Sequence, residues 1–227
     1  MTARLADPPS HTIDPLDIEA YKRHPHQLAR HLLGRNLVRI VDGKRLVGRI
    51  VEVEVYGYER DGASHADSGE PTERTAAMFG EPGTAYVYLI YGMYHCLNVV
   101  APSGERPSAI LVRALRPLEG VGEMAHRRGL ADEPAGELTE SVRRNLASGP
   151  GKLCQAMAID TRFNGMAFDT GSLVIGRGEP AVADPRIEIA QAPRIGLNPS
   201  TVGDAYHWKW RYGIARSKYL SKPLISG

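Results

Sequence analysis

Residues 85–100 read AYVYLIYGMYHCLNVV, two strand-like segments on either side of a short turn. Ala85–Tyr91 and Tyr94–Val100 are rich in the aromatic and β-branched residues that favour strands. Gly92-Met93 separates them, and a connection this short joins neighbouring antiparallel strands. The stretch therefore predicts a tight β-hairpin with tyrosines at its tip.

The segments around this hairpin extend the same kind of structure. Asn36–Val41 and Lys44–Val55 flank Asp42-Gly43, a dipeptide typical of two-residue hairpin turns. A helix is expected at His26–Leu33, because Gly34 follows it as a C-terminal cap would. Further strands are expected at 109–115, 173–175, 186–190 and 212–215, further helices at 117–128, 139–147 and 151–159, and an irregular loop at 57–84.

The order of these elements is mixed, with few strand–helix–strand units. This order favours the α+β class, with a curved, largely antiparallel sheet and surrounding helices. We expect a single domain over residues 16–227, preceded by a flexible N-terminal tail over residues 1–15. A chain of 227 residues is long enough to bury a sizeable core without disulfides.

The composition excludes several classes of protein. At 42% hydrophobic and 24% charged residues it is typical of a globular chain. No apolar run of about 18 residues predicts a membrane span, and the start of the chain lacks the apolar segment of a secretory signal. Cys96 and Cys154 form neither a disulfide framework nor a zinc site, and the histidines are scattered. The sequence therefore predicts no metal, no other cofactor and a reducing, cytosolic compartment.

Charge is unevenly distributed although the net charge is only +2. Residues 21–50 hold eight Lys/Arg and one acid, residues 51–81 hold eight Asp/Glu and two arginines, and residues 186–227 hold seven Lys/Arg and two acids. Basic stretches around an acidic one fit a basic footprint surrounding a pocket with carboxylates. Ordinary surface charge of mixed sign explains the same counts.

Tyrosine is concentrated in one part of the chain. Six of the ten tyrosines fall within residues 56–94, while the chain has only three Phe. A buried Tyr hydroxyl needs a hydrogen-bond partner, so such a cluster suits a surface that stacks flat rings and also hydrogen-bonds. For Tyr86 and Tyr94 alone, ordinary strand propensity is the simpler explanation.

Candidate catalytic residues lie close to these tyrosines. The period of two in a strand places Glu52, Glu54 and Tyr56 on one face. A carboxylate beside an aromatic ring can act as a general base, and a pair of carboxylates also fits glycoside hydrolysis. Exposure of both glutamates on the outer face is the plainer alternative. His65 lies among small residues that would let a ligand approach the backbone, although an exposed loop histidine is also common.

The segment SGPGK, residues 148–152, places glycines at a probable helix start. It would suit an anion or a DNA backbone, or serve as a turn between helices with no ligand. It does not satisfy the pattern of a nucleotide-binding P-loop.

Four segments together resemble the alkyladenine (3-methyladenine) DNA glycosylase family: residues 48–66, 81–100, 110–120 and 148–159. The resemblance covers most of the chain from about His26. It implies a monofunctional glycosylase that flips damaged purines out of duplex DNA, hydrolyses the N-glycosidic bond and leaves an abasic site. It also implies that the 85–100 hairpin protrudes and intercalates into DNA.

The matching positions carry expected roles. Glu54 matches the general base that activates water, and Arg113 matches an arginine that holds the base and the water. Tyr91 matches the wedge that fills the gap in the DNA. The residues expected to contact the flipped base are Tyr56, His65 and Tyr88, which enclose it, and Asn98, which screens the purine 2-position.

The resemblance further implies damaged double-stranded DNA as partner, no membrane, and a monomer. The expected location is a bacterial-type cytoplasm with the nucleoid, or the nucleus in a eukaryote. The alternatives are a catalytically silent binder of damaged DNA and a hydrolase that uses Glu52 and Glu54 on nucleosides or carbohydrates. Val55 stands where alanine is expected and would crowd the pocket wall, and Tyr212 stands where phenylalanine is expected. The range of lesions stays open at this level.

Overall fold

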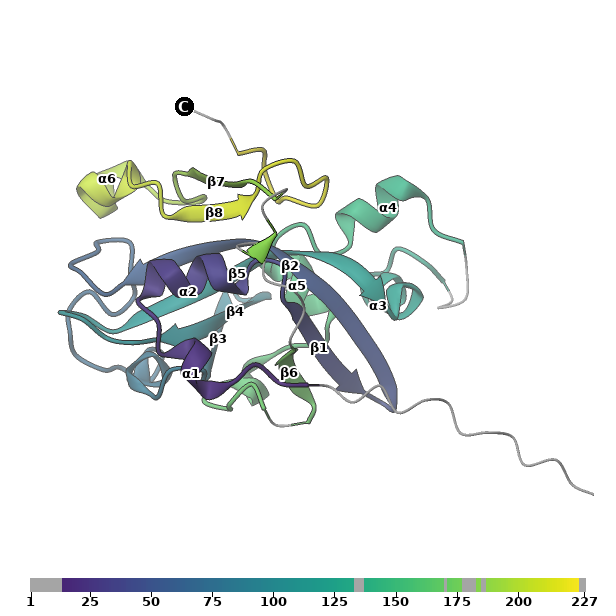
Figure 1. The fold of residues 1–227 in the computed structure, drawn as a ribbon, viewed down its shortest axis with the longest axis horizontal. Helices are drawn as coiled ribbons and strands as arrows, with labels where there is room; N and C mark the ends of the chain where they lie inside the picture. Colours follow the sequence, from purple (N-terminus) through teal and green to yellow (C-terminus); the bar gives the residue numbers. More distant parts are fainter. Residues whose placement is uncertain (1–13, 133–136, 170, 177–182, 185–186, 225–227) are drawn as a thin grey trace, which may run out of the picture.

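Two long strands, β2 (Lys44–Gly57) and β5 (Ser108–Glu119), pair at the centre of an eight-stranded sheet. They are seen in a computed structural model that describes residues 14–132, 137–169, 171–176, 183–184 and 187–224. The sheet order is β3-β4-β5-β2-β1-β6, with β8 pairing to both β2 and β7, and every pairing within these residues is antiparallel (Figure 1). The other strands are β1 (Asn36–Val41), β3 (Ala85–Ile90), β4 (Tyr94–Ala101), β6 (Leu173–Gly176), β7 (Ile189–Ala192) and β8 (Arg211–Ile214).

Short helices surround the sheet, and α2 (Pro25–Leu32) lies across β2 and β5 in Figure 1. Proline is favoured at the first position of a helix, and Pro25 begins α2 there. Gly34 follows with a φ of 87°, as expected for a glycine just beyond a helix. The other helices are α1 (Ile18–Tyr21), α3 (Val121–Arg127), α4 (Glu140–Asn145), α5 (Pro150–Ala156) and α6 (Pro199–Val202), with 3-10 turns η1 (Ala76–Phe79), η2 (Thr161–Phe163) and η4 (Gly203–Tyr206).

The two predicted hairpins are confirmed. Asp42 and Gly43 join β1 to β2 with φ values of 51° and 70°, the left-handed conformations that a two-residue hairpin turn requires. β3 and β4 pair in register from Ile90↔Tyr94 to Ala85↔Val99. The α+β class and the single domain predicted from the sequence therefore hold for the described residues.

Several boundaries predicted from the sequence are wrong by a few residues, and the one at Pro117 changes the type of element. Pro117 does not begin a helix, because β5 continues to Glu119 and Pro117 pairs with Gly48. The register between β2 and β5 shifts next to Gly48, and such irregular positions tolerate a residue without an N–H group. The helix begins instead at Val121. The strand expected at 186–190 is β7 at Ile189–Ala192, and residue 186 lies outside the described part.

A double irregularity between β2 and β5 determines which side chains face the core. Ile50 pairs with Leu115 and Glu52 with Ala114, so Val51 is an extra residue in β2. Val53 then pairs with Val112, so Arg113 is an extra residue in β5. Such bulges bend strands and re-aim side chains, and they are frequent beside active sites.

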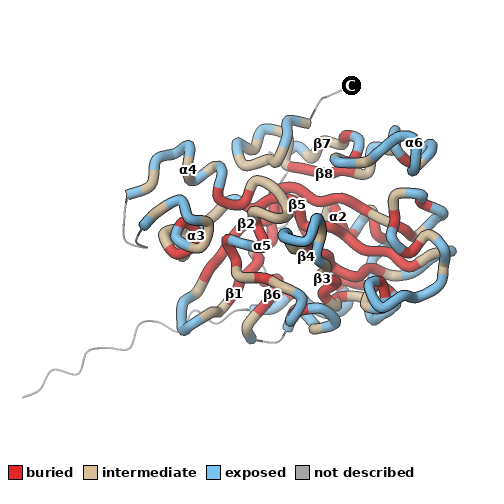
Figure 2. Tube along the Cα trace, turned by 180° about the vertical axis from the view of Figure 1, so that it is seen from behind, coloured by how far each residue is buried: buried red, intermediate tan, exposed pale blue. Residues whose placement is uncertain are grey.

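One hydrophobic core joins the sheet to the surrounding helices. Figure 2 shows that most of the central strands are buried. The core contains Ile50 and also Val53 and Val55, although strict alternation would put Ile50 on the opposite face. The bulge explains this change of phase. The expected tail at residues 1–15 lies outside the described residues except for its last two. No described helix has the length and apolar character to cross a membrane.

Candidate active site

A cavity of about 590 Å³ lies on the sheet face opposite the core residues of the same strands. On β5 the residues Leu111 and Arg113 line the cavity, while Ile110 and Val112 belong to the core. The period of two in each strand therefore separates a core face from a cavity face. The volume is within the range of small-ligand sites. The floor is formed by Tyr56, Tyr86, Tyr88, Ile90, Cys96, Asn98, Ala109, Leu111 and Arg113.

Aromatic rings form the walls of this cavity. The His65 ring lies edge-on to Tyr88, with ring centroids 4.7 Å apart, and its Nδ1 is 3.1 Å from the Tyr86 hydroxyl. Tyr86 and Tyr88 lie 5.1 Å apart, and Tyr56 lines the same space. The prediction of a stacking surface is therefore supported by geometry. Tyr86, explained from the sequence by strand propensity alone, also supports the His65 ring.

The loop that carries His65 is held by a buried ion pair that the sequence did not predict. Both oxygens of Asp61 accept hydrogen bonds from Arg194, at 2.6 and 2.7 Å, and both side chains are fully buried. Asp61 also accepts from the backbone N–H groups of Gly57 and Ala63. The pair ties the beginning of the loop to a segment more than 130 residues later in the chain.

Arg194 also supports the wall of the cavity. Its guanidinium lies 4.7 Å from the centre of the Tyr56 ring and donates to the Val55 carbonyl at 2.9 Å. Arg194 lies outside the four segments that carry the resemblance, so the sequence analysis did not single it out.

Glu54 is fully buried, and three donors contact its carboxylate. Oε2 accepts from the Tyr56 hydroxyl at 2.8 Å and from Nη1 of Arg113 at 3.0 Å. Oε1 accepts from the backbone N–H of Ile195 at 2.8 Å. The three donor residues line the cavity, whereas Glu54 itself lies one layer behind them. The expectation that Glu54 and Tyr56 share a face is confirmed, and the alternative that both glutamates are exposed is wrong.

Arg113 connects Glu54 to Glu52. Its Nη1 binds Glu54, and its Nε lies 3.5 Å from Oε1 of Glu52. Burial disfavours the cation, but the two carboxylates outweigh this and raise the pKa of Arg113 above its usual value. The pKa of the Tyr56 phenol is also raised, first by burial and then by the Glu54 carboxylate, so the phenol remains a donor.

Glu52 has a different environment and does not form a second catalytic carboxylate at the cavity. Its carboxylate is fully buried and binds Nη1 of Arg211 at 2.9 Å. It also accepts from the backbone N–H of Ser221 at 2.6 Å and from the Ser221 hydroxyl at 2.9 Å. A hydrolase that uses Glu52 and Glu54 as a pair is therefore disfavoured by the geometry.

Asn98 is buried in the floor of the cavity. Its side-chain Nδ2 donates to the Tyr86 carbonyl at 3.0 Å, across the register pair that joins β3 to β4. This bond fixes the orientation of the amide. A rigid polar group in the floor can exclude ligands that carry an additional substituent at that point.

The β3–β4 hairpin ends in exposed aromatic and apolar side chains. Tyr91 and Gly92 occupy the turn with φ values of 54° and 69°, and the Met93 N–H donates to the Ile90 carbonyl. The strand therefore ends at Ile90, one residue earlier than expected, since Tyr91 belongs to the turn. Tyr91 is 79% exposed and Met93 67% exposed, yet Tyr91 also lines the edge of the cavity.

The SGPGK segment contributes a further part of the cavity lining, beside the hairpin. Gly149, Pro150, Gly151 and Lys152 line the cavity together with Arg128. Burial and the neighbouring Arg128 guanidinium lower the pKa of Lys152. A side chain at position 151 would press against the Tyr94 ring, with contacts of 3.0 Å, so Gly151 permits the close approach of α5 and the hairpin. Tyr94, like Tyr86, contributes to the site.

Two departures from the expected family pattern have structural explanations. Val55 is buried in the core and is absent from the residues that line the cavity, so the expected crowding of the pocket wall is wrong. The hydroxyl of Tyr212 lies 2.8 Å from Nδ1 of His26, which gives this tyrosine a partner that phenylalanine would lack.

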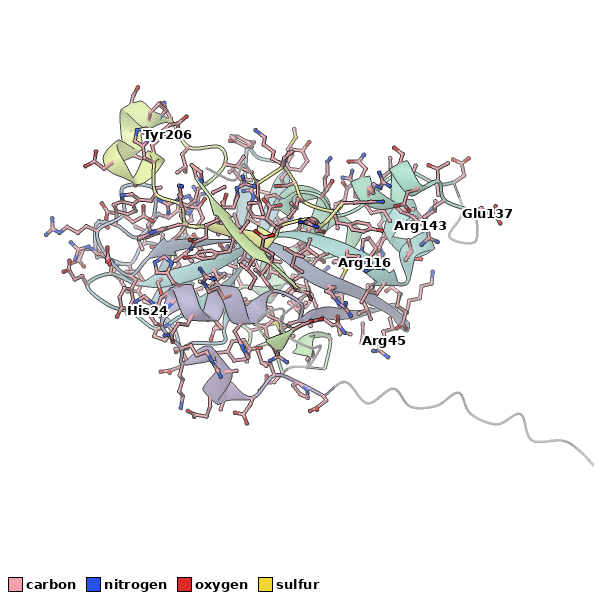
Figure 3. The ribbon with its side chains drawn as sticks, turned by 45° about the horizontal axis from the view of Figure 1, so that its top comes forward. His24, Arg45, Arg116, Glu137, Arg143 and Tyr206 are labelled. Atoms are coloured by element: carbon pink, nitrogen blue, oxygen red, sulfur yellow. The ribbon has the colours of Figure 1, made fainter. Side chains whose placement is uncertain are left out.

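A second cavity, of about 730 Å³, shares no lining residue with the first. It opens near α4 and includes Arg49 and Arg116, the latter labelled in Figure 3. Within the described ranges, no group of three or more His, Cys, Asp or Glu side chains is arranged to hold a metal ion. Cys96 and Cys154 are free and buried.

Comparison with known proteins identifies the relatives of this chain. The sequence model of the methylpurine-DNA glycosylase family matches residues 19–218. A Bacillus cytotoxicus protein named "Putative 3-methyladenine DNA glycosylase" is 42% identical over 96% of this chain and 99% of its own length. A Clostridium tetani protein of the same name is 40% identical over 89% of this chain and 96% of its own length.

Proposed function

This chain belongs to the methylpurine-DNA glycosylase family, and from that premise we propose a monofunctional DNA glycosylase for base excision repair. Its substrate is duplex DNA containing a damaged purine of the 3-methyladenine class. The purine leaves the stack, enters the aromatic cavity and loses its N-glycosidic bond to water, which leaves an abasic site. The observation that carries the proposal is the position of the cavity directly in front of the buried Glu54–Arg113 pair.

In this proposal Glu54 is the general base. A carboxylate offers about four acceptor positions, and three are occupied by Tyr56, Arg113 and Ile195. The remaining one can accept a hydrogen bond from water at the back of the cavity. Glu54 takes the proton as the water oxygen bonds to C1′ of the sugar, and the electrons of the broken C–N bond pass to the purine. A purine that is cationic from alkylation becomes neutral in this step and needs no acid.

The walls favour damaged bases for two physical reasons. Burial, followed by the Arg74 guanidinium, lowers the pKa of His65 to about 4, so this ring is neutral at pH 7. A cationic purine between His65, Tyr56 and Tyr88 gains cation–π attraction with the tyrosines, on the order of 0.5–2 kcal/mol. A damaged base also stacks and pairs less well, so less energy is needed to turn it out of the helix. Asn98 in the floor screens the 2-position and rejects guanine. Tyr91, exposed at the hairpin tip, fills the gap that the flipped nucleotide leaves.

The proposal is tested by an excision assay on three substrates without added metal. A duplex oligonucleotide with a single ethenoadenine or hypoxanthine, DNA methylated by an alkylating agent, and an undamaged duplex are incubated with the protein and then treated with alkali. Strand breaks only in damaged DNA, at the position of the lesion, are expected. If the protein binds lesion DNA tightly but releases no base, the proposal of an enzyme is wrong and the protein is a catalytically silent binder of damaged DNA. In a parallel incubation with free purine nucleosides, release of bases from the nucleosides and from none of the three DNA substrates would assign a nucleoside hydrolase.

A further inference from the structure

The chain after β8 folds back over the catalytic arginine. Residues 217–224, here called the C-terminal strap, place Ser221 between Glu52 and Arg113. The family match ends at residue 218, so Ser221 lies outside the matched region. We propose that Ser221 is a positioning residue, through which the C-terminal strap holds the Arg113 guanidinium in line with Glu54. This inference rests on the proposed glycosylase function.

Ser221 contacts the two buried charges at once. Its hydroxyl donates to Oε1 of Glu52 at 2.9 Å and accepts from Nε and Nη2 of Arg113, both at 3.4 Å. The hydroxyl has one proton and two acceptor positions, so this arrangement uses it fully. Nη1 of Arg113 then points to Glu54. Because the guanidinium is a planar fork, fixing Nε and Nη2 also fixes the direction of Nη1.

Arg113 needs this support because of its place in β5. It is the extra residue of the bulge opposite β2, and both its register neighbours, Val112 and Ala114, are paired. A side chain at a bulge is re-aimed relative to the regular sheet. The contacts to Glu52 and Ser221 supply the orientation that the regular pairing of strands does not.

The C-terminal strap is itself fastened at several points. Arg211 donates to the carbonyls of Lys222 and Pro223, at 3.1 and 3.2 Å, while its Nη1 also binds Glu52. The side chains of Leu220 and Leu224 close over Gly213 of β8, where an added Cβ would meet them at 3.0 and 2.8 Å. The anchored backbone places the Ser221 N–H 2.6 Å from Glu52. The strap, Arg211 and Glu52 therefore act as one rigid support behind Arg113.

The contacts distinguish Ser221 from a residue that takes part in the reaction. Ser221 is absent from the residues that line the cavity, whereas Arg113 lines it. Loss of the Ser221 hydroxyl should therefore affect the bond-breaking step and leave the binding of the lesion duplex unchanged. A residue that only stabilises the fold would not separate these two quantities.

The test compares Ser221→Ala, Ser221→Thr and Ser217→Ala in the full chain. The Ser217 hydroxyl accepts from the Tyr219 backbone within the same strap and does not contact Arg113, so Ser217→Ala is the matched control. Single-turnover excision of ethenoadenine from a duplex, the Kd for the same duplex and the Tm are measured for each. Ser221→Ala should lower the rate about tenfold, the order expected from one hydrogen bond to a charged group, with Kd changed less than twofold.

Ser221→Thr keeps the hydroxyl and should restore most of the rate, while Ser217→Ala should match the wild type. An unchanged rate in Ser221→Ala beside an active wild type would overturn the positioning role and leave the glycosylase function standing. Equal losses of rate and Tm in both alanine variants would assign the strap a purely structural role. A wild type that binds the duplex but releases no base would overturn the proposed function, and the positioning role with it.

Discussion

Arg113 and Glu54 meet across two different strands, with Nη1 of the arginine 3.0 Å from Oε2 of the glutamate and both side chains buried. Arg113 comes from β5 and Glu54 from β2, so the pair depends on the register between the two central strands. The Glu54 carboxylate is thereby held beside the cavity, with both of its oxygens accepting hydrogen bonds. This relationship gives the most direct test of the chemistry.

Glu54→Gln should lower excision by about 10²- to 10⁴-fold, because the amide cannot take a proton from water. The amide retains the size of the carboxylate, so the Kd for lesion DNA should stay within a few-fold of the wild type. Glu140→Gln, the same change in an exposed glutamate on α4, is the control. Excision at the wild-type rate by Glu54→Gln would remove Glu54 from the role of general base.

Tyr91→Ala should slow excision in duplex DNA, since the hairpin tip would no longer fill the gap left by the flipped base. We expect roughly a 10- to 100-fold loss in single-turnover rate, as for one to three kcal/mol of lost base stacking. Tyr206→Ala, at an exposed tyrosine next to α6 (Figure 3), is the control. Equal effects of the two substitutions, or none from Tyr91→Ala, would exclude the wedge.

Asp61→Asn should destabilise the protein by about 3–5 kcal/mol, because it leaves the buried Arg194 guanidinium without its carboxylate. Unfolding in urea measures this loss. Asp160→Asn breaks an exposed pair with Arg162 and should cost less than about 1 kcal/mol. If both variants unfolded at the same urea concentration, the Asp61–Arg194 pair would not hold the His65 loop.

The free energy of unfolding should fall as the pH falls from about 6.5 to 4. Burial, followed by neighbouring cations, lowers the pKa of His26 and of His31 to about 4, while an unfolded histidine titrates near 6.5. Between these values the unfolded chain binds protons that the folded chain does not, so acid favours unfolding and the full stability is present above pH 6.5.

His31 makes this titration accessible to mutation. Its Nε2 lies 2.9 Å from Nη2 of Arg35, a contact that suits only the neutral imidazole. His31→Gln should reduce the change in urea midpoint between pH 7 and pH 5, while His207→Gln, at an exposed histidine, should leave it as in the wild type. A pH dependence that is identical in all three proteins would contradict this assignment.

Local signals predicted much of the fold correctly. The dipeptide Asp42-Gly43 was enough to predict the turn between β1 and β2. The period of two in a strand likewise places Tyr86 and Tyr88 of β3 on one face, and both line the cavity. The helix predicted to begin at Pro117 was wrong, because the pairing of Pro117 with Gly48 in the sheet outweighs the local preference of proline for a helix start. The register between β2 and β5 was not predictable in this way, because no short turn joins these two strands.

Some residues of the candidate site were also predictable from the sequence, and others were not. Glu54 and Tyr56 could be placed together, since they are two residues apart in one strand. Arg113 was predicted as a site residue only through the resemblance of its segment to the glycosylase family. The partners that bury Glu52 and orient the His65 loop, Arg211, Ser221 and Arg194, come from segments more than 100 residues away. Only the folded chain reveals them.

The bulge in β2 makes the reaction depend on the number of residues in one strand. With Val51 as the extra residue, Ile50 and Val53 both face the core although they are three positions apart. One residue inserted between Glu52 and Val53 would shift every later residue of β2 by one position, and a one-residue slip exchanges the two faces of a strand. Glu54 and Tyr56 would then face the core, and Val53 and Val55 the cavity. Insertions should therefore be absent from residues 52–54 among active relatives, while the loop at 102–107 can vary in length. The chemistry of this site is encoded in spacing as much as in the identity of its side chains.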